Sequence, residues 1–104
     1  MTDKYILING QPVVEPDVIK WGRWFEAADD ERIISKTIVN EARVSTVFLG
    51  IDHNFSTGGE PILWETMIFG GQHDGWQERY ISREKAVERH LEIVIKLQAG
   101  ESLE

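Results

Sequence analysis

The chain of 104 residues contains no cysteine. Disulfide bonds, thiolate nucleophiles and zinc sites built from cysteine are therefore excluded. No apolar run approaches the roughly 20 residues that a membrane-spanning helix needs. The first four residues also lack the basic and then apolar pattern of a secretory signal. We therefore expect a cytoplasmic protein that does not engage a membrane.

Basic residues are scarce, with 11 Lys and Arg against 18 Asp and Glu, for a formal net charge of −7. Proteins that bind nucleic acid draw their affinity from clustered Lys and Arg, so we expect no direct nucleic-acid binding. An acidic surface suits a basic partner protein. A modest negative charge more commonly serves only to keep a protein soluble.

The chain shows no internal repeat, no low-complexity tract and no linker. Its length is close to the commonest size of a single domain, so we expect one domain over residues 1–102. The terminal pair, Leu103 and Glu104, could be the scar of an expression tag, and we set it aside from the fold.

The first element is a predicted β-hairpin over residues 5–14. Asn9 and Gly10 separate two apolar runs, and a type I′ turn needs positive φ at both of its central positions. Pro12 lacks an amide donor, which predicts an edge position for the second strand.

The remaining pattern of apolar spacing, turn residues and caps predicts two helices and four strands. The helices begin at Pro16 and after the N-cap Ser82, and the strands cover 32–39, 43–51, 62–69 and 78–81.

Segments 43–51 and 62–69 are apolar on both alternating faces, which is typical of central strands covered on both sides. The sequence therefore predicts an α+β fold in the order ββ-α-ββββ-α. In this fold, an antiparallel sheet of about five or six strands carries two helices packed on one face.

One group of polar residues could form a site. Asp52, His53 and Asn54 follow one central strand, and Glu65 lies within the next. If the two strands pair antiparallel, the loop 52–61 brings these side chains to one end of the sheet. A histidine with two carboxylates could bind a divalent metal or act as an acid–base group.

The pattern of these residues favours a structural role over chemistry. The spacing matches no metal-binding motif, and Asp and Asn are common turn-formers whose side chains accept bonds from nearby amides. We therefore assign no catalytic residue, metal or cofactor. Asp52, His53, Asn54 and Glu65 remain candidates for ligand binding only.

Glu65 interrupts an apolar face, and a buried carboxylate is costly unless it is paired. We expect either that this face is exposed to solvent or that Glu65 has a partner, for which Arg43 and His53 are candidates. In the last helix the predicted apolar stripe follows Val87, Leu91, Val94 and Gln98, with His90, Ile93 and Leu97 beside it. His90 is interpreted as a histidine at the edge of the core.

Two stretches carry a resemblance to a known family. They are VSTVFLGIDHNF at 44–55 and PILWETMIFGG at 61–71. Together they resemble a family of small uncharacterised proteins of bacteriophages, prophages and their bacterial hosts. The similarity extends to 21–28 and 80–90, so it covers most of the chain. It implies an accessory role in phage biology and gives no catalytic residue to transfer.

Three functions follow from these observations. The leading hypothesis is a non-enzymatic phage or prophage accessory protein that binds a host or phage macromolecule, with a protein as the expected partner. The alternative is a small enzyme or ligand-binding protein, such as a metal-dependent hydrolase, that uses the loop 52–61 with Glu65. A third possibility is self-assembly through the edges of the first hairpin.

Overall fold

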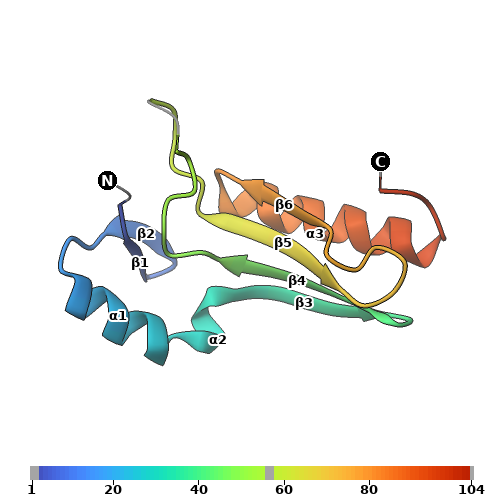
Figure 1. Cartoon of the computed structure of the whole chain (residues 1–104), viewed down its shortest axis with the longest axis horizontal. Helices are drawn as coiled ribbons and strands as arrows, with labels where there is room; N and C mark the ends of the chain where they lie inside the picture. Colours follow the sequence, from blue (N-terminus) through green and yellow to red (C-terminus); the bar gives the residue numbers. More distant parts are fainter. Residues whose placement is uncertain (1–2, 56–57, 104) are drawn as a thin grey trace.

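The computed structural model of the chain describes residues 3–55 and 58–103. Within these ranges the fold is α+β, which confirms the predicted class (Figure 1). The strands separate into an antiparallel pair and a four-stranded antiparallel sheet. The elements are β1 (Tyr5–Ile8), β2 (Gln11–Val14), α1 (Val18–Ala27), α2 (Asp29–Arg32), β3 (Ile33–Val39), β4 (Ala42–Phe48), β5 (Trp64–Phe69), β6 (Gln77–Tyr80) and α3 (Arg83–Gln98).

The first hairpin forms as predicted. Ile8 pairs with Gln11, and the two turn residues between them both have positive φ, 52° for Asn9 and 79° for Gly10. The turn chemistry thus fixes the register of β1 and β2.

Helix α1 begins after an aspartate N-cap and joins the hairpin to the large sheet. The Asp17 carboxylate accepts from the amides of Ile19 and Lys20. The indole N–H of Trp21 donates to the carbonyls of Tyr5, at 3.1 Å, and Gly50, at 3.0 Å. These bonds tie α1 to both β1 and the chain that leaves β4.

The large sheet runs in the order β3-β4-β5-β6, and α3 packs against all four strands (Figure 1). The β3–β4 turn is tight, because Val39 pairs with Ala42 and Asn40 adopts φ 53°. The expectation of helices on one side of the sheet is met by α3, whereas α1 packs against β1.

The prediction that β4 and β5 are covered on both sides is wrong. Burial alternates along both strands, so only the face toward α3 is fully buried. The opposite side, called the open face, holds alternate residues of every strand in the sheet. From β3 to β6 these are Ile33, Lys36, Ile38, Arg43, Ser45, Val47, Glu65, Met67, Phe69, Gln77 and Arg79.

Helix α3 turns a slightly different stripe toward the sheet than the sequence predicted. Its buried residues are Ala86, His90, Ile93 and Val94, whereas Leu91 is 58 % exposed. His90, expected at the edge of the core, is 1 % exposed and lies within it.

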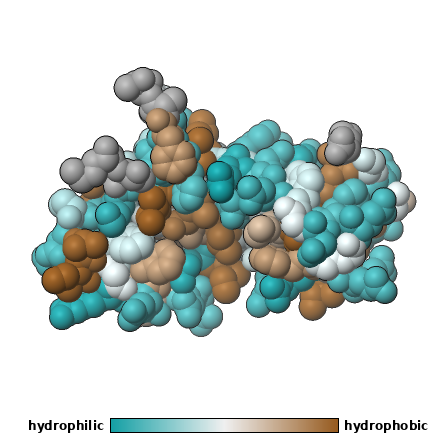
Figure 2. Space-filling model, in the orientation of Figure 1, coloured by the Kyte–Doolittle hydropathy of each residue, from teal (hydrophilic) through white to brown (hydrophobic). Residues whose placement is uncertain are grey.

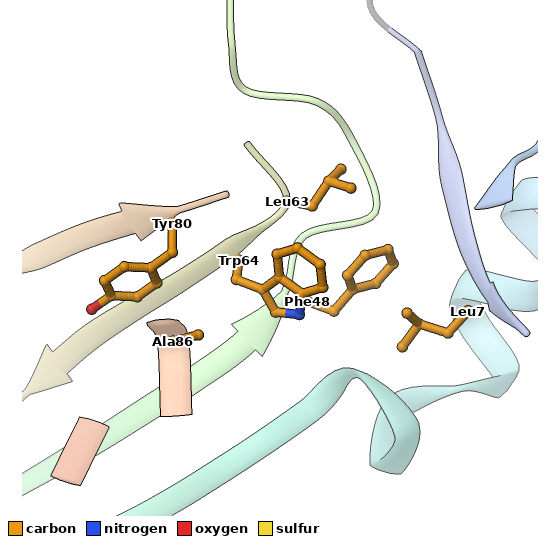
Figure 3. Close-up of a cluster of buried hydrophobic side chains, with 6 residues drawn as sticks. All are labelled: Leu7, Phe48, Leu63, Trp64, Tyr80 and Ala86. Carbon is orange, nitrogen blue, oxygen red and sulfur yellow. The ribbon is translucent and has the colours of Figure 1, made fainter. Parts of the chain in front are cut away.

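Two buried clusters stabilise the fold. The first lies at the hairpin end of the sheet and comprises Leu7, Phe48, Leu63, Trp64, Tyr80 and Ala86 (Figure 3). The second lies between α3 and the other end of the sheet, with Val44, Ile68 and Ile93 at its centre. Leu103, set aside as a possible tag residue, is 8 % exposed and packs in this second cluster, while Glu104 lies outside the described residues.

Within the described residues, no helix combines the length and apolar character needed to cross a membrane.

Candidate functional site

The polar residues after β4 organise the loop that they begin. Oδ1 of Asp52 accepts from the amide of Asn54 at 2.7 Å and from the amide of Ile62 at 2.9 Å. The carboxylate therefore forms an Asx turn and also holds the two ends of the loop together.

His53 and Asn54 bond to backbone of the same loop. Nδ1 of His53 donates to the carbonyl of Ile51 at 2.8 Å, and Nδ2 of Asn54 donates to the carbonyls of Gly58 and Glu60. Residues 56 and 57 of this loop lie outside the described part of the chain. Among the described residues, these hydrogen bonds of His53 and Asn54 therefore stabilise the conformation of the loop.

Glu65 has a partner that the sequence did not identify. Its Oε2 accepts from Nε of Arg79 at 2.9 Å, because these residues face each other in the β5–β6 register. Of the two predicted partners, Arg43 is paired with Phe69 and places its guanidinium 4.6 Å from that ring. His53 bonds within the loop instead.

The structure does not bring Glu65 together with the loop residues Asp52, His53 and Asn54. The amide of His53 donates to the carbonyl of Ile62, three positions before Glu65 in the chain. Three extended residues span about 10 Å, so Glu65 lies well away from the His53 backbone. Across residues 3–55 and 58–103, no three His, Cys, Asp or Glu side chains come together in a way that could hold a metal ion.

Glu65 belongs instead to the open face, which mixes apolar and charged side chains. Three basic residues, Lys36, Arg43 and Arg79, share this face with a single acid, Glu65. The face is thus locally basic on a chain of net charge −7.

Apolar side chains lie among these charges. Ile38 is 75 % exposed and Phe69 40 % exposed, and both flank Arg43 in one row across the sheet. Figure 2 shows a band of hydrophobic side chains near the middle of the view, over the ends of β4 and β5 nearest the hairpin, with hydrophilic ones around it.

A buried polar network crosses the face of the sheet that α3 covers, and it was not predicted from the sequence. His90 is hydrogen-bonded to Thr37 through Nε2, at 2.9 Å, and to Thr46 through Nδ1, at 2.7 Å. Thr46 is bonded in turn to Thr66 at 2.6 Å. The available signal was that Thr46 and Thr66 alternate with large apolar residues on the inward faces of their strands.

No family model, curated protein or solved structure matches this chain.

Proposed function

We propose that the protein is a non-enzymatic binding protein that docks a partner protein on the open face of its four-stranded sheet. The observation that carries this proposal is that α3 covers one side of the sheet while the other side presents exposed apolar side chains. The resemblance to phage and prophage proteins supports an accessory role for this binding, and we propose that it takes place in the cytoplasm of a bacterial host.

The side chains of the open face define the chemistry of the partner. Ile38 and Phe69 offer apolar area, which contributes about 25 cal/mol for each Å² that a partner removes from water. Three basic side chains against one acid favour a partner surface that carries Asp or Glu beside its own apolar residues.

The Arg43–Phe69 contact suits this use of the face. A guanidinium held over an aromatic ring keeps its N–H donors available at its edge. A partner carboxylate can therefore pair with Arg43 while apolar groups of the partner cover the exposed part of Phe69.

The alternative of a loop-based enzyme has less support. Asp52, His53 and Asn54 each bond to backbone of their own loop. The Glu65 carboxylate is engaged by Arg79 on a different surface.

The test is selection of binders from a library of random peptides displayed on a surface, followed by affinity measurement with purified peptides. We expect the selected peptides to combine acidic and apolar residues. Their affinity should fall at least tenfold for the double variant Ile38→Ser with Phe69→Ser, which removes the exposed apolar side chains.

The matched control is Leu91→Ser with Ile95→Ser, on the exposed side of α3. This control variant should bind the selected peptides as the native protein does. Higher salt should weaken peptide binding by the control variant and by the native protein alike. Equal loss of binding in the two double variants would contradict the proposal. So would preferential binding of a single-stranded oligonucleotide over every selected peptide.

A further inference from the structure

The outer side of α3 carries an exposed apolar patch. Leu91 is 58 % exposed and Ile95 is 61 % exposed, and they lie four positions apart in the helix. Residues at this spacing are neighbours on one side of a helix, so the two side chains form a continuous patch. The buried residues of α3 face the sheet, so the patch points away from the sheet.

Acidic side chains flank this patch. Glu84 and Glu88 lie about two turns and one turn before Leu91, and Glu92 follows it directly. All three acids are exposed. Glu88 and Glu92 make long contacts with basic residues of the same helix, at 3.9 Å and 3.6 Å, and such surface contacts contribute little. We call this surface the helix face, and it comprises Glu84, Glu88, Leu91, Glu92 and Ile95.

The open face of the sheet is the chemical complement of the helix face. Its exposed Ile38 and Phe69 flank Arg43 in one row across three strands, and Lys36 is on the same face. In the described part of the chain, neither Lys36 nor Arg43 forms an ion pair. Three neighbouring strands span about 10 Å, which is close to the width of one helix with its side chains. One acidic and apolar helix can therefore cover the row.

The two complementary faces lie on opposite sides of the same molecule, because α3 covers one side of the sheet and the open face is the other side. A copy therefore cannot cover its own open face with its own helix face. Two copies joined by one such contact also leave one open face and one helix face unused. A contact of this kind is heterologous and continues from copy to copy.

We propose that the open face of one copy docks the helix face of a second copy, so that copies of this chain assemble head to tail. This inference rests on the proposed use of the open face for docking, and it names the partner. The apolar pair of the helix face packs against Ile38 and Phe69, while its carboxylates pair with Lys36 and Arg43. The net charge of −7 on each copy opposes this association and keeps it weak.

The first test is the mass of the native protein in solution, measured by sedimentation equilibrium. Between about 10 µM and about 1 mM, we expect the weight-average mass to rise from that of a monomer to more than that of a dimer, for a Kd of about 1 mM or tighter. A monomer over this whole range would overturn the proposal. Binding of the selected peptides by such a monomer would leave the proposed docking function standing, so the two failures are distinguishable.

Two double variants identify the surfaces in contact. The face variant, Ile38→Ser with Phe69→Ser, and the helix variant, Leu91→Ser with Ile95→Ser, should each remain monomeric at about 1 mM. Mixed in equal amounts, they should form a 1:1 dimer and nothing larger, because each pair of molecules then holds one intact face of each kind. Absence of this dimer would contradict the proposal. So would native association by either variant alone, which is the result expected of pairing through the edges of the first hairpin.

The matched control is Val18→Ser with Ile19→Ser, which removes a similarly exposed apolar pair from α1. This variant should associate as the native protein does. Loss of association in this control, equal to the loss in the face and helix variants, would show that exposed apolar area in general causes the association and would contradict the proposal.

Charge reversal provides a second test that keeps the apolar side chains and so decides the matter if the face variant does not fold. Lys36→Glu with Arg43→Glu, and Glu88→Lys with Glu92→Lys, should each weaken association at least tenfold. The second of these variants lowers the net negative charge of the chain, so general repulsion cannot explain its loss. A mixture of the two should again form assemblies larger than a dimer. Native association by either charge variant alone would contradict the proposal.

Discussion

At the scale of single residues, His90 is the most constrained polar group in the described part of the chain. It belongs to the side of α3 that faces the sheet, is fully buried, and has a threonine hydroxyl bonded to each ring nitrogen. In a neutral imidazole one nitrogen donates a hydrogen bond and the other accepts one. The ring therefore donates to one of the two threonine hydroxyls and accepts from the other, and Thr46 continues the network to Thr66. Burial lowers the pKa of His90 below its ordinary value of 6.5, because the charged ring is poorly solvated there.

This lowered pKa predicts a loss of stability in acid. Below about pH 6.5 the unfolded state binds a proton that the folded state resists, so the free energy of unfolding falls as pH falls. The full contribution of His90 is present above that pH. The slope from one histidine is at most about 1.4 kcal/mol per pH unit. Urea unfolding of the native protein between about pH 8 and pH 5 measures the decline.

The variant His90→Gln isolates the contribution of this residue. Glutamine can donate and accept but does not titrate, so the variant should show a shallower decline whatever its overall stability. His73→Gln, in the loop between β5 and β6, should retain the native slope. An unchanged slope in His90→Gln would show that other groups cause the acid sensitivity.

At the scale of elements, two turns meet at the end of the sheet remote from the hairpin. A Cβ placed on Gly70 would lie 2.5 Å from the carbonyl oxygen of Glu41, in the β3–β4 turn. Gly70 also has φ 86°, and its amide donates to the Asp74 carboxylate at 2.6 Å. The close approach of the two turns thus requires a glycine at this position.

Gly70→Ala is expected to destabilise the protein by more than about 2 kcal/mol, since it adds a clash with backbone to an unfavourable φ. Gly75→Ala is the matched control, because Gly75 has φ 88° but nothing within 4 Å of an added Cβ. The Gly75→Ala substitution should lower the free energy of unfolding by only about 1 kcal/mol. Chemical denaturation of both variants measures the difference, and equal costs would contradict the argument from close approach.

At the scale of the whole molecule, the hairpin and α1 are joined to the sheet by shared core and by hydrogen bonds. Leu7 packs in the same buried cluster as Phe48 and Trp64. The Trp21 indole bridges the carbonyls of Tyr5 and Gly50. These contacts give the two sheets a common interior, so we expect them to unfold together.

The prediction is a single unfolding transition, with coincident curves from far-UV circular dichroism and tryptophan fluorescence. Leu7→Ala should lower the stability by about 2–5 kcal/mol and shift both curves equally, because it opens a cavity in the shared cluster. The neighbouring variant Ile8→Ala, at an exposed position, should cost less than about 1 kcal/mol. Two separated transitions would show instead that the hairpin and the sheet are independent.

Much of this architecture could be predicted because its signals are local. The Asn9–Gly10 turn and the Ser82 cap depend only on the backbone of residues close to them in sequence. Both appear at the predicted positions. The short helix α2 was missed, and the predicted stripe of α3 included the exposed Leu91, because propensity and spacing do not show which neighbour an element meets.

The candidate site shows the same division. The sequence by itself determined the α+β class and the first hairpin, since periodicity and turn chemistry follow from the chain's own geometry. Only the tertiary structure decided that Glu65 pairs with Arg79, that one face of the sheet is open, and that the Trp64 indole N–H has no partner among residues 3–55 and 58–103. The physical reason is that register and packing bring together residues distant in sequence, and a single strand carries no record of which strand or helix will lie beside it.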